Sequence, residues 1–130
     1  MSHKISYRVY YEDTDAGGVV YYANYLKFAE RARTEYLRAH GVSQQELVEN
    51  EGVLFVVRKA EVDLMKPAKL DDLIAIETAV IEQKAATIRM EQNIYLEKTK
   101  LCTIKVQLVV INKQFRPIRM PEFLKEIFKA

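Results

Sequence analysis

Residues 10–38 decide the fold of this chain and read YYEDTDAGGVVYYANYLKFAERARTEYLR. This stretch contains three acids, Glu12, Asp13 and Asp15, directly before a pair of glycines, Gly17 and Gly18. A helical pattern begins within about six residues of the glycines. Because the first amides of a helix have no partner inside the helix, the stretch brings an acid close to free N–H groups. We therefore expect an active site in this arc.

The helical pattern runs from about Ala23 to His40. Its apolar residues follow the i, i+3, i+4 spacing of one helix face: Tyr25, Phe28, Ala29, Ala32, Tyr36 and Leu37. Asn24 is a candidate cap at its start, and Gly41 suits its end. The pattern predicts one long amphipathic helix.

The rest of the chain alternates between apolar strand patterns and polar turns. We expect a first strand at Ser6–Tyr11, a short helical connection at Ser43–Asn50, further strands at Val53–Met65, Leu73–Glu82, Thr87–Leu96 and Cys102–Asn112, and a C-terminal helix at Pro121–Lys129. The predicted turns, at residues 66–72, 83–86 and 97–100, are short. Short turns between long strands indicate antiparallel neighbours.

The predicted order of elements is typical of an α+β fold in which one long helix covers a sheet. Residues 108–111 read LVVI and are apolar on both faces of their strand. A strand of that kind needs cover on both sides. With only one long helix available, the second cover is expected from another copy of the chain, so we predict a homo-oligomer.

Length and composition set the class of protein. A chain of 130 residues suits a single domain, 1–130. The one cysteine, Cys102, excludes an internal disulfide, and the N-terminus carries no apolar leader, so we expect a soluble cytoplasmic protein. The longest apolar runs, such as Val53–Val57, are far shorter than the roughly 18 residues of a membrane span. A net charge of +2 is too small to indicate nucleic-acid binding.

Residues 11–25, which follow the pattern Y-x-D-T-D-x-x-G-V-V-Y-Y-x-N-Y, resemble the signature of the 4-hydroxybenzoyl-CoA thioesterase class of hot-dog folds. The motif F-x-E-R-A-R at residues 28–33 continues the resemblance. Within the class, the sequence is most similar to the YbgC-type acyl-CoA thioesterases associated with the Tol-Pal system. Weaker motifs at residues 55–59, 67–72 and 116–121 extend the similarity over nearly the whole chain.

The resemblance implies a five-stranded antiparallel sheet wrapped around the long helix, assembled as dimers and usually homotetramers. It also implies hydrolysis of acyl-CoA, with a short-chain or aromatic acyl group. Asp15 would be the catalytic carboxylate, as nucleophile or general base, and the backbone amide of Tyr22 would polarise the thioester carbonyl. Many YbgC-type sequences carry histidine at the position of Tyr22, whereas the 4-hydroxybenzoyl-CoA branch carries tyrosine. No cofactor or metal is expected, because coenzyme A is part of the substrate.

The remaining site residues are assigned to substrate binding. Gly17 and Gly18 let the backbone approach a ligand closely, and Val19 and Asn24 border them in sequence. Lys84 and Arg116 match positions where the resembled family places basic residues for the coenzyme A phosphates. Such a nucleotide site would lie across a subunit boundary.

Other functions and roles were weighed against this interpretation. A Ser-His-Asp site lacks a positioned histidine, because His3 falls in an expected frayed terminus and His40 at the far end of the helix. Cys102 is expected at a strand start as a packed thiol. Without the family resemblance, Asp15 would be interpreted as a turn residue whose side chain hydrogen-bonds to its own backbone. A hot-dog dehydratase would need a histidine at the helix start. A non-catalytic module that binds acyl-CoA or acyl carrier protein for an envelope complex remains an alternative.

Overall fold

The computed structural model describes residues 2–130. Its helices and strands, in chain order, are β1 (Ser2–Arg8), the 3-10 helix η1 (Tyr11–Asp13), α1 (Asn24–Ala39), α2 (Gln44–Glu46), the π-helix η2 (Leu47–Glu51), β2 (Leu54–Leu64), β3 (Leu73–Gln83), β4 (Thr87–Leu96), β5 (Thr99–Ile111) and α3 (Glu122–Ile127). No helix among these residues is long and apolar enough to cross a membrane.

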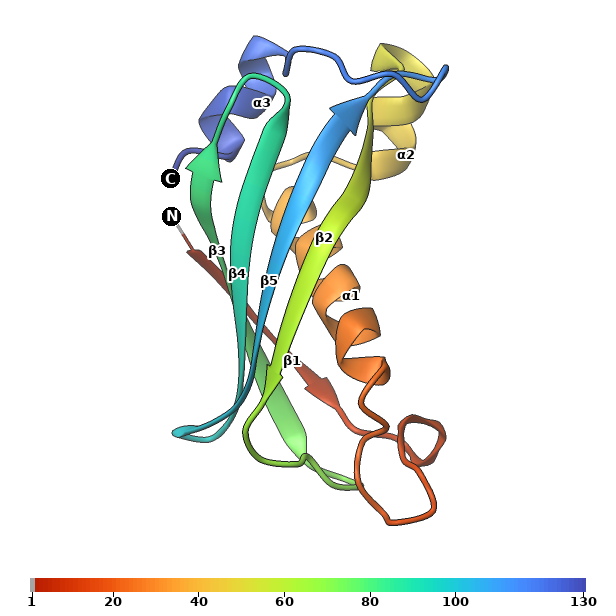
Figure 1. The fold of residues 1–130 in the computed structure, drawn as a ribbon, viewed down its shortest axis with the longest axis vertical. Coiled ribbons are helices and arrows are strands. Elements are labelled where there is room, and N and C mark those ends of the chain that lie inside the picture. Colours follow the sequence, from red (N-terminus) through yellow and green to blue (C-terminus); the bar gives the residue numbers. More distant parts are fainter. Residues whose placement is uncertain (1) are drawn as a thin grey trace.

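The five strands form one antiparallel sheet in the order β1-β3-β4-β5-β2. β1 and β2 are therefore its edges. Figure 1 shows α1 lying against one face of the sheet, which we call the inner face, with the loop that precedes α1 at one end and α3 at the other. The predicted α+β arrangement of one long helix on an antiparallel sheet is confirmed.

The buried side of α1 consists of the six residues that the spacing predicted, Tyr25, Phe28, Ala29, Ala32, Tyr36 and Leu37. Ala29 and Ala32 are completely buried, and such small side chains let the helix axis lie close to the sheet. Alternate residues of β3 face the helix, as the strand's burial pattern shows. Removing an aromatic ring from this layer, as in Phe28→Ala, costs about 3–5 kcal/mol in comparable cores.

A polar side chain fastens α1 to the centre of the sheet. Gln92 of β4 is fully buried, and its Nε2 donates to the Ala29 carbonyl at 2.8 Å and to Thr78 Oγ1 at 3.1 Å. Its Oε1 accepts a hydrogen bond from Arg33 Nη1 at 3.0 Å. Because an unbonded buried amide is costly, these contacts hold one orientation of the helix on the sheet.

The predicted first strand, Ser6–Tyr11, was wrong in its position. β1 pairs with β3 from Ser2↔Ala79 to Arg8↔Leu73, and the ladder ends there because β3 begins at Leu73. Tyr10 and Tyr11 leave the sheet and lead into η1. The expectation of a frayed terminus at His3 was also wrong, because His3 pairs with Thr78. The aromatic residues of this stretch indicated a strand, but the pairing with β3 determines where the strand begins and ends.

The boundaries of α1 agree with the prediction within one residue at each end, and Gly41 follows with φ +78°. Asn24 does not cap the helix. It is the first helical residue, and its Nδ2 donates to the Asp13 carbonyl at 2.9 Å, so the side chain binds the preceding loop instead.

Most of the apolar run at the end of β5 is buried within one chain. Within one chain Leu108, Val110 and Ile111 are already buried. The segment after β5 turns back onto it, through the amide of Ile118 donating to the Val110 carbonyl and an isolated bridge between Ile111 and Pro117. These backbone contacts lie beside β5 in the plane of the sheet, and Val109 is only half-buried, so the expected cover by a second copy stays a prediction.

β5 begins at Thr99, three residues before the predicted start, so Cys102 lies well inside the strand opposite Ile94 and Leu64. The predicted turn at residues 97–100 is shorter because Thr99 and Lys100 pair with the end of β4. Cys102 is fully buried, and burial raises the pKa of its thiol to about 12, with the charge of Asp63 adding to the effect.

The buried position of Cys102 predicts an unreactive thiol. With a pKa about 12, only about 10⁻⁴ of the thiol is thiolate at pH 8, and only the thiolate attacks alkylating reagents. We expect negligible labelling by iodoacetamide at pH 8 in the folded protein and complete labelling in urea, measured by intact mass. Rapid stoichiometric labelling of the folded chain would contradict the burial.

Candidate active site

The loop between β1 and α1 folds into two consecutive turns. In the first, Tyr10 N donates to Asp13 Oδ2 at 2.8 Å, and Thr14 Oγ1 donates to the Tyr11 carbonyl at 2.7 Å. Asp13 is therefore a turn-forming residue. The carboxylate of Asp13 is occupied in shaping the loop.

The second turn carries the other acid. The amides of Asp15 and Gly18 donate to the carbonyls of Val19 and Asp15 at 2.9 and 3.0 Å. Gly18 has φ +80°, a left-handed conformation that side chains disfavour. This turn is where the glycine pair is required.

Asp15 binds its own backbone, because its Oδ1 accepts a hydrogen bond from Gly17 N at 2.8 Å. A Cβ on Gly17 would lie 3.2 Å from that oxygen, so a side chain there would press on the carboxylate. Among residues 2–130 no donor is paired with Asp15 Oδ2. The turn thus orients the carboxylate and leaves one oxygen open.

A cavity of about 290 Å³ borders Asp15. Its lining is mainly apolar and aromatic: Asp15, Val19, Val20, Tyr22, Tyr25, Leu64, Met65, Lys66 and Pro67. The loop is pinned to the opposite wall by the amide of Val20, which donates to the Ala68 carbonyl at 2.9 Å. The cavity therefore lies between the loop before α1 and the connection from β2 to β3.

Tyr25 closes the buried side of this cavity. Its hydroxyl oxygen accepts a hydrogen bond from the amide of Ala68 at 3.0 Å. Burial raises the pKa of Tyr25, and the Ala68 amide opposes that shift. Tyr25 is therefore neutral near pH 7 and acts as a wall that joins α1 to the β2–β3 connection.

Tyr22 lies in the turn that leads into α1, two residues before the first helical residue. The amides of Tyr21 and Asn24 are engaged, since Tyr21 N donates to the Asp13 carbonyl and Asn24 N to the Tyr21 carbonyl, whereas the amide of Ala23 has no acceptor among the described residues. Among the described residues the amide of Tyr22 has no acceptor. Its ring is exposed and lies against Tyr21, with 4.9 Å between the ring centroids.

The predicted site residues fall into two groups. Asp15, Val19 and Tyr22 line the cavity, while Gly17 and Gly18 shape the turn beside it. Asn24 lies next to the site but not in the cavity lining. The wall formed by residues 64–67 was not predicted as part of the site, although Pro67 begins one of the weaker motifs, because its position depends on how β2 ends in space.

The second group lies at the opposite end of the molecule. Lys84 follows the last residue of β3, whereas the Asp15 loop contacts the connection that precedes β3. An 11-residue strand spans roughly 35 Å. Arg116 lies near Lys84, because the segment after it bonds the β3–β4 turn through the amide of Met120 and the Ala85 carbonyl. Within one chain, Lys84 and Arg116 are therefore remote from Asp15. Figure 1 shows the β3–β4 turn and the loop before α1 at opposite ends of the molecule.

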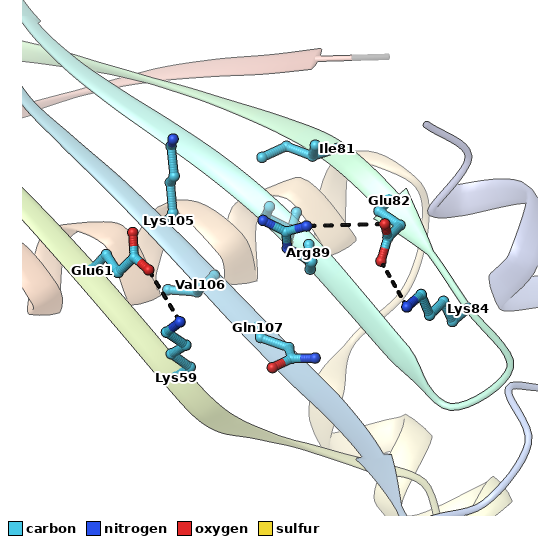
Figure 2. A pocket seen from close by; sticks show the side chains of 10 residues that line it. Lys59, Glu61, Ile81, Glu82, Lys84, Arg89, Lys105, Val106 and Gln107 are labelled. Atoms are coloured by element: carbon cyan, nitrogen blue, oxygen red, sulfur yellow. Dashed lines mark ion pairs between the residues drawn. The ribbon is translucent and has the colours of Figure 1, made fainter.

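Lys84 belongs to a charged hollow on the outer face of the sheet, about 300 Å³ in volume. Figure 2 shows Lys84 and Arg89 on two sides of Glu82, at 3.7 and 3.9 Å from its carboxylate oxygens, and Lys59 paired with Glu61 at 3.2 Å. Such exposed pairs contribute little to stability. Arg89 and Lys59 were not predicted as site residues. Alternation in β4 places Arg89 outward, but Lys59 has the parity of Phe55 and Val57 and reaches the outer face only through the register shift between Val57 and Lys59.

Comparison with known proteins gives the family. The profile of the Thioesterase-like superfamily matches residues 9–128. The chain is 50% identical to an acyl-CoA thioesterase YbgC of Haemophilus influenzae, over 93% of this chain and 90% of that protein, and 45% identical to an acyl-CoA thioester hydrolase YbgC of Escherichia coli, over 94% and 92%. The crystal structure of a probable thioesterase from Bartonella henselae, 40% identical, superposes with a TM-score of 0.90 over 93% of this chain and 100% of that one.

The chain belongs to the thioesterase-like superfamily, and within it to the YbgC-type acyl-CoA thioesterases. Membership makes it a thioester hydrolase with a hot-dog fold, as the resemblance of residues 11–25 implied. The two histidines of this YbgC-type chain lie away from the Asp15 cavity, in β1 and at the end of α1. Within residues 2–130 no three His, Cys, Asp or Glu side chains gather in a way that would hold a metal ion.

Proposed function

We propose that the chain hydrolyses the thioester of acyl-CoA to a free acid and coenzyme A in the cavity beside Asp15. One observation carries the proposal: an oriented carboxylate with an open oxygen and a residue with an unpaired amide, Tyr22, line the same mainly apolar cavity of about 290 Å³. The family supports the class of reaction. The roles of the two residues are our assignment.

In the proposed reaction the Tyr22 amide donates to the thioester oxygen while the carbonyl carbon is attacked. Asp15 either attacks that carbon itself, which releases the coenzyme A thiolate and leaves an anhydride for water to open, or it removes a proton from the attacking water. A positioned base contributes about 10²–10⁴-fold and an oxyanion donor about 10²–10³-fold. A thioester is already activated, so these two groups suffice.

The cavity also supports a choice of acyl group. Apart from Asp15 and Lys66, the residues of its lining carry no charge, and most of them are apolar or aromatic. Its volume lies near the lower limit of pockets that hold small molecules, about 300–1,000 Å³. We assign it a short-chain or aromatic acyl group.

Replacing the carboxylate tests the assignment. Asp15→Asn keeps the size of the side chain and an acceptor for the Gly17 amide, but it removes the base. We expect kcat/KM for short and aromatic acyl-CoA substrates to fall about 10²-fold or more. Glu12→Gln, an exposed acid three residues away, is the matched control and should retain activity. If Asp15→Asn kept parental activity, Asp15 would not be the catalytic carboxylate and this proposal would be wrong.

We further propose that the chain is a homo-oligomer, a dimer or a homotetramer built from dimers. The support is β2, an edge strand whose side chains are largely exposed. Four of the exposed side chains are large and apolar: Val56, Val57, Val62 and Leu64. A long edge strand with exposed apolar side chains is a template for pairing with another chain.

Sedimentation equilibrium at micromolar concentration tests the assembly. We expect a mass of at least twice the 15.1 kDa of one chain. Val62→Lys, which places a charge on β2, should shift the protein toward the monomer. A parental protein that sediments at 15.1 kDa would contradict the proposal.

The coenzyme A phosphates are assigned to Lys84 and Arg116 of a neighbouring subunit. Both side chains are exposed, and they lie at the same end of the chain. Because roughly 35 Å separates that end from Asp15 in one chain, they can serve an active site only across a subunit boundary. Cytoplasmic location, and acyl carrier protein or Tol-Pal proteins as partners, stay predictions.

Removing one phosphate contact should affect binding more than chemistry. We expect Arg116→Gln to raise KM for acyl-CoA several-fold with little change in kcat, because the lost contact is present in both ground and transition states. Lys98→Gln removes the same charge from the β4–β5 turn and should leave KM unchanged. An effect at Lys98 and none at Arg116 would overturn the assignment.

A further inference from the structure

A second cavity lies apart from the Asp15 site, between the C-terminal half of α1 and the inner face of the sheet. Its volume is about 120 Å³. A single water needs about 10–15 Å³ of such space, so the cavity has room for several waters or for one small apolar molecule. Six apolar side chains form most of its wall: Leu37, Phe55, Val57, Met90, Leu108 and Phe128.

A cation borders this apolar space. Arg33 lines the cavity, and burial lowers the pKa of its guanidinium, an effect that the charge of Glu30 opposes. Within residues 2–130 its one hydrogen bond runs from Nη1 to Gln92 Oε1 at 3.0 Å, and no carboxylate lies within 4.0 Å as an ion-pair partner. A guanidinium carries five donors, so most of them lack a protein acceptor.

A buried hydrogen-bond network holds the Arg33 side chain in place. Gln92 is fully buried, and its Nε2 already donates to Ala29 and Thr78, which turns Oε1 toward Arg33. Glu30 also lines the cavity, but it is exposed, and its carboxylate accepts a hydrogen bond from Thr34 Oγ1 at 3.1 Å. The charge of Arg33 is therefore held beside the cavity without a direct counter-ion.

From this arrangement we propose that the Arg33 cavity binds a small monocarboxylate with an apolar body, such as a short fatty acid. The guanidinium fork matches the two oxygens of a carboxylate. The six apolar side chains accommodate a hydrocarbon chain. A phosphate dianion fits less well, because Arg33 is the one cation in the lining and Glu30 would repel the second charge.

Titration of the full chain with hexanoate, followed by amide NMR shifts, tests the proposal. We expect shifts around Phe55, Leu108 and Phe128, and none of similar size for 1-hexanol, which has the same chain without the charge. Asp15→Asn should bind hexanoate equally well, so this test does not depend on the proposed hydrolysis. Shifts confined to Val19, Tyr25 and Met65 would place the acid in the other cavity and overturn the proposal.

Charge variants on one helix sharpen the test. Arg33→Gln should weaken hexanoate binding at least about tenfold, the effect of one charged hydrogen bond. Arg31→Gln, on the exposed side of α1, should leave it unchanged, and Glu30→Gln should tighten it by removing a competing carboxylate. If Arg33→Gln does not fold, Val57→Phe, which fills the cavity and keeps the guanidinium, should abolish the shifts. Equal affinity in Arg33→Gln, or no shifts in the parental chain, would refute the site.

Discussion

The packing of α1 on the inner face of the sheet is the contact on which the rest of the structure depends. Ala29 and Ala32 allow the helix to approach closely, and the buried amide of Gln92 binds the Ala29 carbonyl, so the helix has one position along the sheet. That position determines where the helix begins. The packing of the core therefore helps to determine the position of the preceding loop, which carries Asp15 and Tyr22.

The active-site loop illustrates how local and tertiary constraints combine. Gly18 adopts a conformation with positive φ, and the Gly17 amide holds the Asp15 carboxylate, so the turn is encoded locally. The cavity, however, exists only because Tyr25 and the amide of Val20 join the loop to the β2–β3 connection. Asp15 can therefore be both a turn-forming residue and the proposed catalytic residue. The hydrogen bond that stabilises the turn also orients its carboxylate.

Sequence reasoning was most accurate where periodicity was long. The six buried residues of α1 and the bounds of β4 followed from spacing alone. It was least accurate where a partner decides the outcome. β1 ends at Arg8 because β3 begins opposite it, and β5 begins at Thr99 because β4 continues to Leu96. Helical spacing predicted Arg33 on the polar face of α1, opposite the apolar residues. The structure shows it half-buried and bonded to Gln92, because the sheet determines what covers that side of the helix.

The central claim is that Asp15 and the Tyr22 amide act on one carbonyl in one cavity. A crystal structure of Asp15→Asn with a bound short-chain acyl-CoA tests it most directly. The account predicts the thioester oxygen about 2.7–3.1 Å from the Tyr22 nitrogen, with the residue 15 side chain facing the carbonyl carbon or its attacking water. An acyl-CoA whose thioester lies outside this cavity, or whose oxygen is bound by other donors, would contradict it.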